Sequence, residues 1–415
     1  MSIITPEFIS NATKEEANRF LVQDTITELL RSHAKNLISA ALEAEVKCVL
    51  AELNHNGIEA IRNGYLPARE ITTAIGNVEV KVPRIRSKNS GEVVNFTSTL
   101  IPKYLRRSKS ISAWAAYAYL KGISEKDIAS VLEVVLGKGA NRLSPSVISE
   151  MKKSWVKEFD DWNNRDLSKH NFLYIYCDGI YQEIRGGNPK VCVLVIIGID
   201  ETGTKYVIAL EDGIRESTQS WRELLIGLKA RGFLEPKLCV GDGAMGLWAA
   251  ISEIFPNTLH QRCFMHKTAN ILNYMPKAIQ PKAKSDIQQI WMSDCKDNAQ
   301  KAMDLFKEKY QDKYPKAVNC LIKDKDTLLT FYKFPAIHWA HIRTTNPIES
   351  TFATLRHRTR NTNGAFSKDS ALSMMFQLAM EAQKTYKKIS GLERMADIVN
   401  GVVFEDGIPV VAEAI

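Results

Sequence analysis

The sequence predicts a mixed α/β protein, in which a mainly helical N-terminal region with a small β-hairpin precedes a sheet layered with helices. Three observations predict this class. Apolar residues recur at helical spacing over residues 14–53, short apolar runs alternate with amphipathic segments over 172–260, and a polar, lysine-rich segment with helical periodicity follows. A length of 415 residues predicts more than one domain.

The composition excludes several classes of protein. Hydrophobic residues make up 45% and charged residues 25% of the chain, which excludes a wholly disordered or collagen-like protein. The longest apolar run, 191–199, is shorter than the roughly 18 residues of a membrane span, and the N-terminus lacks the pattern of a signal peptide. We therefore expect a cytoplasmic protein with no membrane partner, whose seven scattered cysteines are reduced thiols.

Basic residues are concentrated in one stretch of a chain whose formal net charge is +8. Residues 81–109 hold eight basic side chains and one acid, and an excess of positive charge favours an anionic partner. An ordinary solvated basic face is the alternative interpretation. The basic residues of this stretch that we expect to contact such a partner are Arg84, Arg86, Arg106 and Arg107.

The first 83 residues predict a long helix followed by a hairpin. The helix covers 14–53, with Asn11 or Thr13 as its N-cap. The dipeptide Gly76-Asn77 lies between two β-branched runs and predicts the turn of a hairpin, which Pro83 ends.

Residues 110–168 have the outline of a helix-turn-helix unit. Helical spacing over 110–132 is interrupted at 121–124, where Ser124 and Asp127 form a capping-box pattern, and Ser144-Pro145 predicts another helix start. In such units the later helix enters the major groove of DNA. Most short helical hairpins bind nothing, so the prediction of DNA contact here depends on the adjacent basic stretch.

Residues 172–260 predict a mixed sheet with two aspartates at strand ends. The expected strands are 172–176, 191–199, 206–210, 237–241 and 258–260, and the expected helices are 217–230, capped by Ser217 or Thr218, and 244–254. Asp178 and Asp242 follow the first and fourth strands. We expect both to lie just past the carboxyl ends of strands, where sites in open α/β sheets tend to occur.

A third acid, Glu349, follows a helical insertion over about 267–332. Asn346-Pro347 marks a helix start, with Glu349 in the first turn. Carboxylates suit Mg²⁺ or Mn²⁺, and two such ions about 3.5–4 Å apart can promote in-line phosphoryl displacement. A single Asp-Gly pair is more often a turn or a helix cap, and periodicity alone does not identify the third acid.

Several short motifs together resemble the bacterial Mutator-type insertion-sequence transposases. Each motif is weak alone, but the set occurs in order over nearly the whole chain. The motifs are Asn63-Gly-Tyr65, Val82-Pro-Arg-Ile-Arg86, Gly122-Ile-Ser124, Asp178-Gly-Ile-Tyr, Val240-Gly-Asp242-Gly, His260-Gln-Arg-Cys263-Phe-Met-His266 and Thr344-Thr-Asn-Pro-Ile-Glu349-Ser. The departures are Cys177 before the first aspartate and Pro347 where alanine is frequent; neither affects the acids.

The resemblance implies a fold, an activity and a cofactor. The fold is an RNase H-like core interrupted by an all-helical insertion, and Asp178, Asp242 and Glu349 form a catalytic triad that binds two Mg²⁺ or Mn²⁺ ions. The activity is the nicking of DNA by water at the terminal inverted repeats of an insertion sequence, followed by attack of a 3′-hydroxyl on a phosphodiester of the target DNA, which joins the element's end to the target and releases a target-strand oxygen. A nucleoid-associated prokaryotic protein that acts as a homodimer or larger homo-oligomer on double-stranded DNA is implied, with residues 14–53 as candidates for pairing.

The motif Cys263-x-x-His266 is characteristic of these transposases. A zinc site needs four ligands, and even with His260 the set is incomplete. We favour a packing role for Cys263 and place His266 beside the scissile phosphate as a catalytic candidate. The arginines expected to contact DNA near the acids are Arg262, Arg343, Arg356 and Arg358. For Arg356 and Arg358 a solvated helix face is an equal alternative.

We thus predict six segments: an N-terminal helical region (1–60), a basic hairpin and linker (61–109), a helix-turn-helix-like region (110–168), the first part of the core (169–266), a helical insertion (267–340), and the rest of the core with the tail (341–415).

Two alternatives remain for the function. One is a catalytically silent DNA-binding protein derived from a transposase, which the intact acids argue against. The other is an RNase H-like nuclease that joins no strands, which the long N-terminal region argues against.

Overall fold

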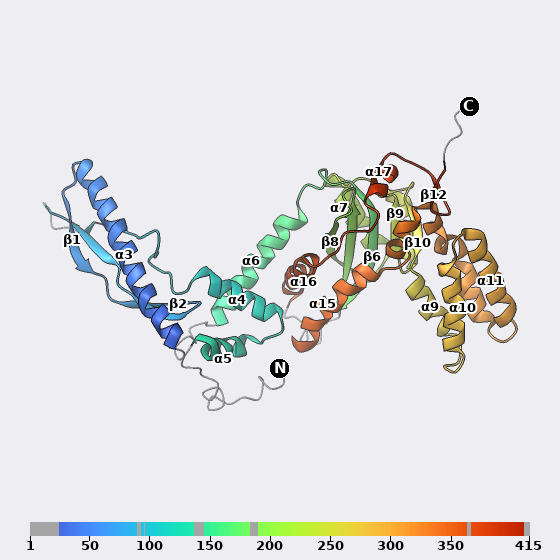
Figure 1. Cartoon of the computed structure of the whole chain (residues 1–415), viewed down its shortest axis with the longest axis horizontal. Coiled ribbons are helices and arrows are strands. Elements are labelled where there is room, and N and C mark those ends of the chain that lie inside the picture. Colours follow the sequence, from blue (N-terminus) through green and yellow to red (C-terminus); the bar gives the residue numbers. More distant parts are fainter. Residues whose placement is uncertain are drawn as a thin grey trace. The chain divides into compact units, whose positions relative to one another are not determined.

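The computed structural model has the mixed α/β class that the sequence predicts (Figure 1). It describes residues 25–88, 93–94, 96–136, 145–182, 190–362 and 367–410, without the side chains at 93, 125–126, 145–147 and 357–362. The predicted N-caps Asn11 and Thr13, the predicted helix over 14–24, and Ser144 lie outside the described residues. The chain forms two compact units, Met1–Lys153 and Ser154–Ile415.

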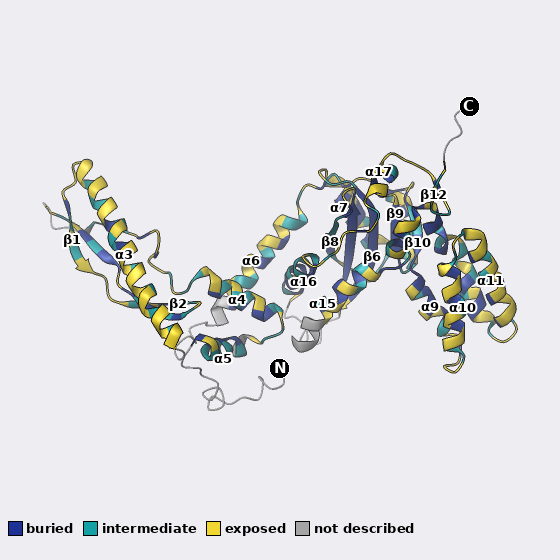
Figure 2. Cartoon of the chain, viewed as in Figure 1, coloured by how far each residue is buried: buried dark blue, intermediate teal, exposed yellow. Residues whose placement is uncertain are grey.

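In the first unit, one long helix packs against two small sheets. Helix α3 (Thr25–His55) buries Leu42 and Val46, and much of its remaining surface is exposed (Figure 2). One sheet pairs β2 (Arg69–Thr73) with β3 (Gly76–Val80), and the other has the order β1 (Ala60–Tyr65), β4 (Pro83–Ser87), β5 (Val93–Val94).

The predicted hairpin exists, but its turn was placed wrongly. Gly76 is the first residue of β3 and pairs with Thr73, so Ala74 and Ile75 make the turn. Gly76 has a φ of 102°, and the Arg31 guanidinium occupies the space where a side chain at this position would lie. Arg31 Nε donates to Ile75 O at 2.8 Å, which holds the turn against α3. The hairpin ends at Val80, shortly before Pro83 as expected, and Pro83 begins β4 of the other sheet.

Three helices follow the small sheets: α4 (Lys109–Leu120), α5 (Glu125–Leu136) and α6 (Pro145–Asn163). The predicted interruption and capping box are confirmed. Ser124 Oγ accepts from the Asp127 backbone N–H at 3.2 Å and donates to Asp127 Oδ2 at 2.7 Å. Gly122 has a φ of 105°, a conformation that favours glycine just after a helix.

The second unit is built on a five-stranded mixed sheet, as the sequence predicts. Its strands are β6 (Phe172–Gln182), β7 (Val191–Asp200), β8 (Lys205–Gly213), β9 (Leu238–Gly241) and β10 (Leu259–Arg262), in the order β10-β9-β6-β7-β8. Strands β6, β9 and β10 are parallel, whereas β7 is antiparallel to both β6 and β8.

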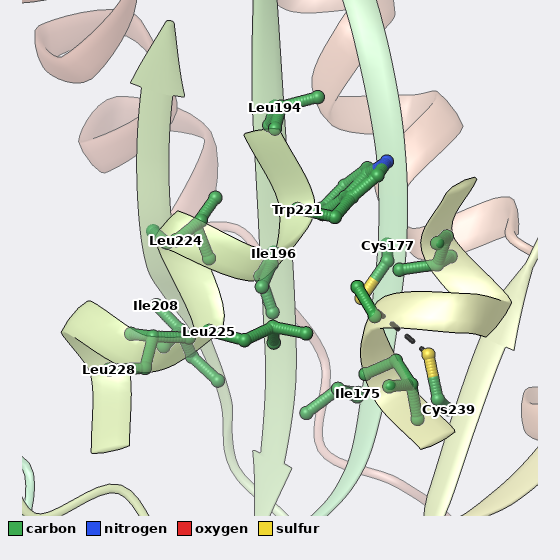
Figure 3. Packing of buried hydrophobic residues seen from close by; sticks show 14 of the residues in the cluster. Ile175, Cys177, Leu194, Ile196, Ile208, Trp221, Leu224, Leu225, Leu228 and Cys239 are labelled. Atoms are coloured by element: carbon green, nitrogen blue, oxygen red, sulfur yellow. Dashed lines mark hydrogen bonds between the residues drawn. The ribbon is translucent and has the colours of Figure 1, made fainter. Parts of the chain in front are cut away.

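Helices cover both faces of this sheet. On one face, α7 (Thr218–Ala230) and α8 (Met245–Ile254) bury Trp221, Leu225 and Leu228 against Ile196 and Ile208 (Figure 3). Ser217 caps α7 by accepting from the Ser220 backbone N–H, one of the two caps that the sequence allowed.

The opposite face of β6 meets the segment before the last long helices. Tyr174 Oη lies 2.8 Å from His338 Nδ1, and Tyr176 Oη donates to His341 O at 3.0 Å. Side chains alternate along a strand, so Asp178 shares this face with the two tyrosines. The elements that follow are η2 (Ala336–His338), α14 (Trp339–Ile342), α15 (Asn346–Thr362) and α16 (Lys368–Gln383).

The segment between β10 and α14 is helical, as its periodicity predicts. It contains α9 (Phe264–Leu272), α10 (Gln280–Met292), α11 (Lys296–Tyr310), α12 (Pro315–Lys323), α13 (Lys325–Leu328) and η1 (Thr330–Lys333). The tail forms α17 (Glu393–Val399) and an unpredicted pair of short strands, β11 (Phe404–Glu405) and β12 (Ile408–Pro409). In the part of the chain that the structure describes, every helix is too short or too polar to cross a membrane.

We predict that Trp221→Ala destabilises the second unit by about 3–5 kcal/mol, because it opens a cavity between α7 and the sheet. The matched control is Ile226→Ala on the same helix, where the isoleucine is 45% exposed, and its cost should stay below about 1 kcal/mol. Urea unfolding followed by circular dichroism measures both changes. Equal shifts in the two variants would contradict this account of the core.

Candidate active site

Asp178 lies within β6 and not past its end, which corrects the expectation from the sequence. The parallel pairing of β6 with β9 stops at Cys177↔Gly241, but the antiparallel pairing with β7 continues to Gln182↔Val191. The long partner strand thus keeps β6 extended through Asp178. Its side chain is 9% exposed, and Asp178 Oδ1 accepts from the Gly179 backbone N–H at 2.8 Å.

Asp242 follows β9 directly, as predicted. Its Oδ1 accepts from the Ala244 backbone N–H at 2.8 Å, which closes a tight turn before α8. Gly243 in this turn has a φ of 85°, and the Arg262 guanidinium lies where a side chain at 243 would be. Glycine is therefore required here both by the backbone conformation and by the neighbouring arginine.

Glu349 lies in the first turn of α15, as predicted, and a contact with α9 fixes where this helix begins. Both the backbone N–H and the hydroxyl of Thr345 donate to Cys263 Sγ at 3.3 Å. Thr345 O accepts from the Glu349 backbone N–H at 3.1 Å, so the same threonine joins the helix start to Cys263. His266 Nε2 lies 3.2 Å from Glu349 Oε1.

The three predicted acids and His266 come together in two overlapping groups that share Asp178. One group is Asp178, His266 and Glu349, and the other is Asp178, Glu216 and Asp242. In each group, one ligand atom from each residue lies within 4.8 Å of the others. The acids come from β6, from the turn after β9 and from α15, so residues far apart in sequence share one site.

Glu216 is the acid that sequence reasoning missed. It lies between β8 and the N-cap of α7, and its neighbour Arg215 has a φ of 60°, an uncommon conformation for a residue other than glycine. Its side chain occupies the space beside Gly179, next to Asp178. One feature of the sequence could have indicated Glu216. It lies in the connection between a predicted strand and the next predicted helix, as Asp242 does.

Burial and neighbouring charge raise the pKa values of two acids of this site, Asp178 and Glu216. Burial, reinforced by the charge of Asp242, raises the pKa of Asp178 to about 7, although the Gly179 N–H and His266 oppose the shift. Burial and Asp242 also raise the pKa of Glu216. Like charges gathered in a partly buried place disfavour ionisation, and a cation bound among them would relieve this repulsion.

Cys263 and His266 form a polar pair beside the acids. The hydrogen bond to Cys263 raises the pKa of His266 to about 9 against the effect of burial, and the charges of Asp178 and Glu349 add to this shift. For Cys263, burial alone would raise the pKa, but hydrogen bonds from His266 and Thr345 lower it overall. Neither Cys263 nor His260 belongs to a possible metal group among the described residues.

The predicted arginines of the second unit lie in different surroundings. Arg262 is buried next to Gly243, and Arg356 lies 3.9 Å from Glu349 with about half of its side chain exposed. Arg343 instead donates from Nη1 to Trp291 O at 2.7 Å, at the end of α10, so its guanidinium already has a structural contact. The side chain of Arg358 lies outside the described residues.

The other four predicted arginines belong to the first unit. Arg86 and Arg106 are exposed and Arg84 is half-buried. Arg107 donates from Nε to Ser112 Oγ at 3.0 Å and pairs with Glu150 at 3.7 Å.

Comparison with known proteins identifies the family. The family model described as "Transposase, Mutator family" matches residues 5–389. The chain belongs to this family. Two curated relatives are similar over most of their own length. The transposase for insertion sequence element IST2 of Acidithiobacillus ferrooxidans is 48% identical over 67% of this chain and 94% of its own, and that for IS6120 of Mycolicibacterium smegmatis is 43% identical over 70% and 89%.

A third relative, at lower identity, matches more of the chain. The transposase for insertion sequence element ISRM5 of Rhizobium meliloti is 26% identical over 90% of this chain and 92% of its own. Among solved structures, the "Drosophila P element transposase strand transfer complex" aligns with 76% of this chain and 87% of its own, at 11% identity and a TM-score of 0.30. That similarity is too low to support an inference.

We predict that Asp178→Asn raises the melting temperature in EDTA, and more so at pH 8 than at pH 6. In the folded chain the pKa of Asp178 is raised to about 7. Asp178 therefore does not lower the free energy of unfolding at a pH below its unfolded pKa. It lowers that free energy more and more as the pH rises from the unfolded to the folded pKa, and by the full amount above about pH 7. Asparagine carries no charge at either pH. Differential scanning fluorimetry measures the change, with the exposed Asp160→Asn as the matched control. A gain that did not depend on pH would contradict this electrostatic account.

Proposed function

We propose that this chain is the DNA transposase of an insertion sequence, and that it binds the terminal inverted repeats, cleaves DNA there and joins the ends to target DNA. Asp178, Asp242 and Glu349 are the proposed catalytic acids. The observation that carries the proposal is the convergence of these three acids in two groups that share Asp178. Membership of the Mutator family and the insertion-sequence transposases among the relatives support it.

The residues of the site fit divalent cations. Carboxylate oxygens are the ligands that Mg²⁺ and Mn²⁺ prefer, and the shared Asp178 provides for two neighbouring ions. We assign the acids as ligands, with Glu216 as a fourth carboxylate beside Asp242. We do not assign His266, because its raised pKa keeps it protonated at neutral pH. Bound there, two ions would promote attack by water or a 3′-hydroxyl and stabilise the leaving oxygen.

The residues around the acids hold Glu349 in position and place a positive charge beside the acids. Thr345 and Cys263 fix the start of α15, so Glu349 approaches Asp178 from a fixed direction. Protonated His266 pairs with Glu349 and presents a positive charge to the site. A phosphate oxygen entering the site would find in His266 a hydrogen-bond donor of opposite charge.

We further propose that the second unit is an RNase H-like core. Three consecutive antiparallel strands, β6 to β8, followed by β9 and β10 parallel to β6 on its other side, support this assignment. The helical segment between β10 and α14 would be the insertion expected before the glutamate.

The first unit is the proposed reader of the DNA ends. Its helices α4 and α5 and the first part of α6 follow the basic stretch, where Arg86 and Arg106 are exposed. Because two ends of an element must be held together for joining, we propose that the chain acts as a homodimer or larger homo-oligomer.

The test of the catalytic assignment uses a labelled duplex that carries the element's own end, with Mg²⁺ or Mn²⁺. Asp178→Ala, Asp242→Ala and Glu349→Ala should each reduce cleavage and joining by at least about a hundredfold while end binding stays within about threefold. Each variant removes a proposed ligand of the cations that would stabilise the charge of the reacting phosphate, and loss of a single oxyanion-hole donor, a smaller electrostatic contribution, already costs about 2.7–4 kcal/mol. Chelation by EDTA should abolish the reaction of the wild type.

Other outcomes of this experiment point to other functions. End binding without chemistry in the wild type would favour a silent, transposase-derived DNA-binding protein. Cleavage without joining on any DNA would favour a nuclease. Activity that survives Glu349→Ala would show that the third acid is placed wrongly.

A second test concerns DNA contact by the first unit. We predict that Arg86→Gln and Arg106→Gln each weaken binding to the end duplex and reduce the slope of log affinity against log salt by about 1, as expected when one phosphate contact is lost. Lys47→Gln, which removes an exposed charge of the same sign from α3, is the matched control and should leave the slope unchanged. Fluorescence anisotropy over a range of salt concentrations measures the slopes, and identical slopes in all variants would remove these arginines from the interface.

A further inference from the structure

A hollow of about 620 Å³ opens beside the Asp242 turn. It lies between the turn after β9, helix α8, the end of β10 with α9, and helices α12 and α13, all within the second unit. Gly243, the residue after the proposed catalytic Asp242, is part of its lining. A group bound in this hollow would therefore lie next to the catalytic acids without occupying their place.

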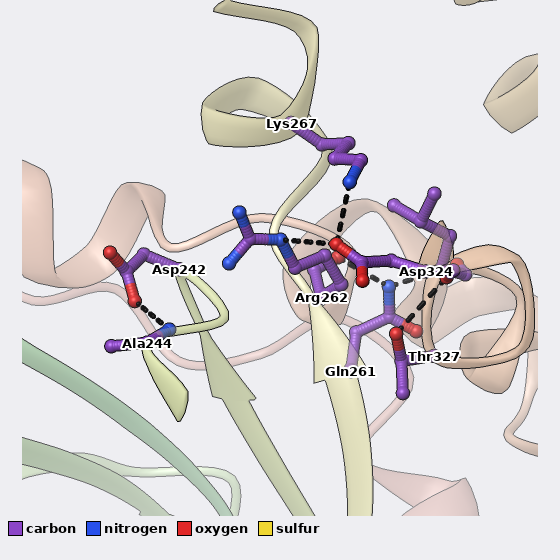
Figure 4. A network of polar contacts seen from close by, with 8 residues as sticks. Asp242, Ala244, Gln261, Arg262, Lys267, Asp324 and Thr327 are labelled. Carbon is purple, nitrogen blue, oxygen red and sulfur yellow. Dashed lines mark hydrogen bonds and ion pairs between the residues drawn. The ribbon is translucent and has the colours of Figure 1, made fainter. Parts of the chain in front are cut away.

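Arg262 lines the hollow and is 6% exposed. Figure 4 shows its guanidinium between the Asp242 turn and Asp324. Its Nε lies 3.4 Å from Asp324 Oδ2 in an ion pair, but neither the buried Nε nor the buried Nη1 has a hydrogen-bond partner among the described residues. A buried donor without a partner is costly, and a charged one more so, which indicates that a ligand completes this site.

The charges around the hollow favour an anion. Lys267, 3% exposed, donates from Nζ to Asp324 Oδ2 at 2.6 Å, so one carboxylate faces two buried cations. Lys316 and Lys323 add two exposed cations to the lining, against one further acid, Asp326. The positive charge of the lining is therefore only partly neutralised by the protein.

The lining also offers aromatic surface. Trp248 of α8 lines the hollow and stacks on His260, with ring centroids 4.6 Å apart and planes 15° from parallel. Burial lowers the pKa of His260, so the stack is between neutral rings at neutral pH and holds the indole in place. Tyr274, 52% exposed, is a second aromatic residue of the lining.

We propose that the hollow binds one unpaired nucleotide of the substrate DNA strand, with its phosphate at Arg262 and its base against Trp248. This inference rests on the proposed function and adds to it a site that takes a nucleotide out of the duplex next to the reacting phosphate. A phosphate on the surface of an intact duplex would meet the exposed lysines, but a buried guanidinium is reached only by a group that enters the hollow. A cationic lining with aromatic side chains is the combination that binds single-stranded DNA.

The experiment compares end duplexes that are fully paired with duplexes that carry one mismatch, moved one position at a time along the terminal base pairs. Binding to the full-length chain is measured by fluorescence anisotropy in EDTA, so that no cleavage occurs. A mismatch lowers the cost of unpairing, which is a few kcal/mol. We expect the wild type to bind at least one mismatched duplex about tenfold more tightly than the paired duplex.

Three variants test whether the hollow causes this gain. Trp248→Ala and the double variant Lys316→Gln/Lys323→Gln should lose most of the tenfold gain, and Trp248→Phe should retain much of it because phenylalanine still stacks on a base. The matched control is Lys301→Gln/Lys307→Gln, which removes two exposed lysines of α11 that do not line the hollow and should keep the full gain. The ratio of the two affinities corrects for any uniform loss of DNA binding.

The outcomes separate this inference from the proposed function. If the wild type binds and joins ends but gains nothing from a mismatch at any position, the nucleotide site is wrong and the transposase remains. A gain that persists in folded Trp248→Ala, with folding checked by circular dichroism, also overturns the site. Failure of the wild type to bind its end at all would overturn both proposals.

Discussion

The contact between Cys263 and Thr345 determines where the third acid lies. Asp178 and Asp242 are placed by neighbouring strands of one sheet, but Glu349 belongs to a helix that begins after the whole helical segment from α9 to α14. Two hydrogen bonds from Thr345 to the buried sulfur join the start of α15 to the start of α9. This contact, together with the packing of buried Ile348 and Phe352, holds Glu349 beside His266 and Asp178.

The sheet places the carboxyl group of Asp178 in a buried position that disfavours its charged form. Asp178 is held in the middle of a strand, among other acids and away from water, because the strand that pairs with it continues past it. Such positions cost stability, and proteins retain them where the charge is used. The positive groups nearby are divided between two places: His266 lies with Glu349, and Arg262 and Lys267 lie with Asp324.

The sequence predicted the architecture of the second unit well because its core elements have strong patterns. The apolar run 191–199 has the length of a buried strand, and Trp221 and Leu228 recur at helical spacing. The first unit was predicted less well, since β1 and β4 are short and largely polar and their pairing is between residues distant in the chain. At the turn before β3, the position of Gly76 was decided by Arg31 of α3, a tertiary contact that no local pattern reveals.

In the site, too, local sequence patterns predicted some features, and others depend on tertiary contacts. The motif resemblance pointed to Asp178, Asp242 and Glu349, but no spacing rule could show that Asp178 lies inside a strand. Glu216 was missed because its connection to Asp178 depends on how the turn after β8 folds. The structural contact of Arg343 could not be predicted from the sequence either, since its partner is a backbone carbonyl at the end of α10.

The helical segment leaves the core and returns to it at adjacent points. Phe264, at its beginning, donates its backbone N–H to Arg343 O at 3.1 Å, just before α15. The two ends are thus joined directly to each other, and the intervening helices need not hold them together. Because closing a longer loop costs only about 0.6 kcal/mol for each doubling of its length, this segment can lengthen, shorten or exchange its helices over evolution while the acids stay in register.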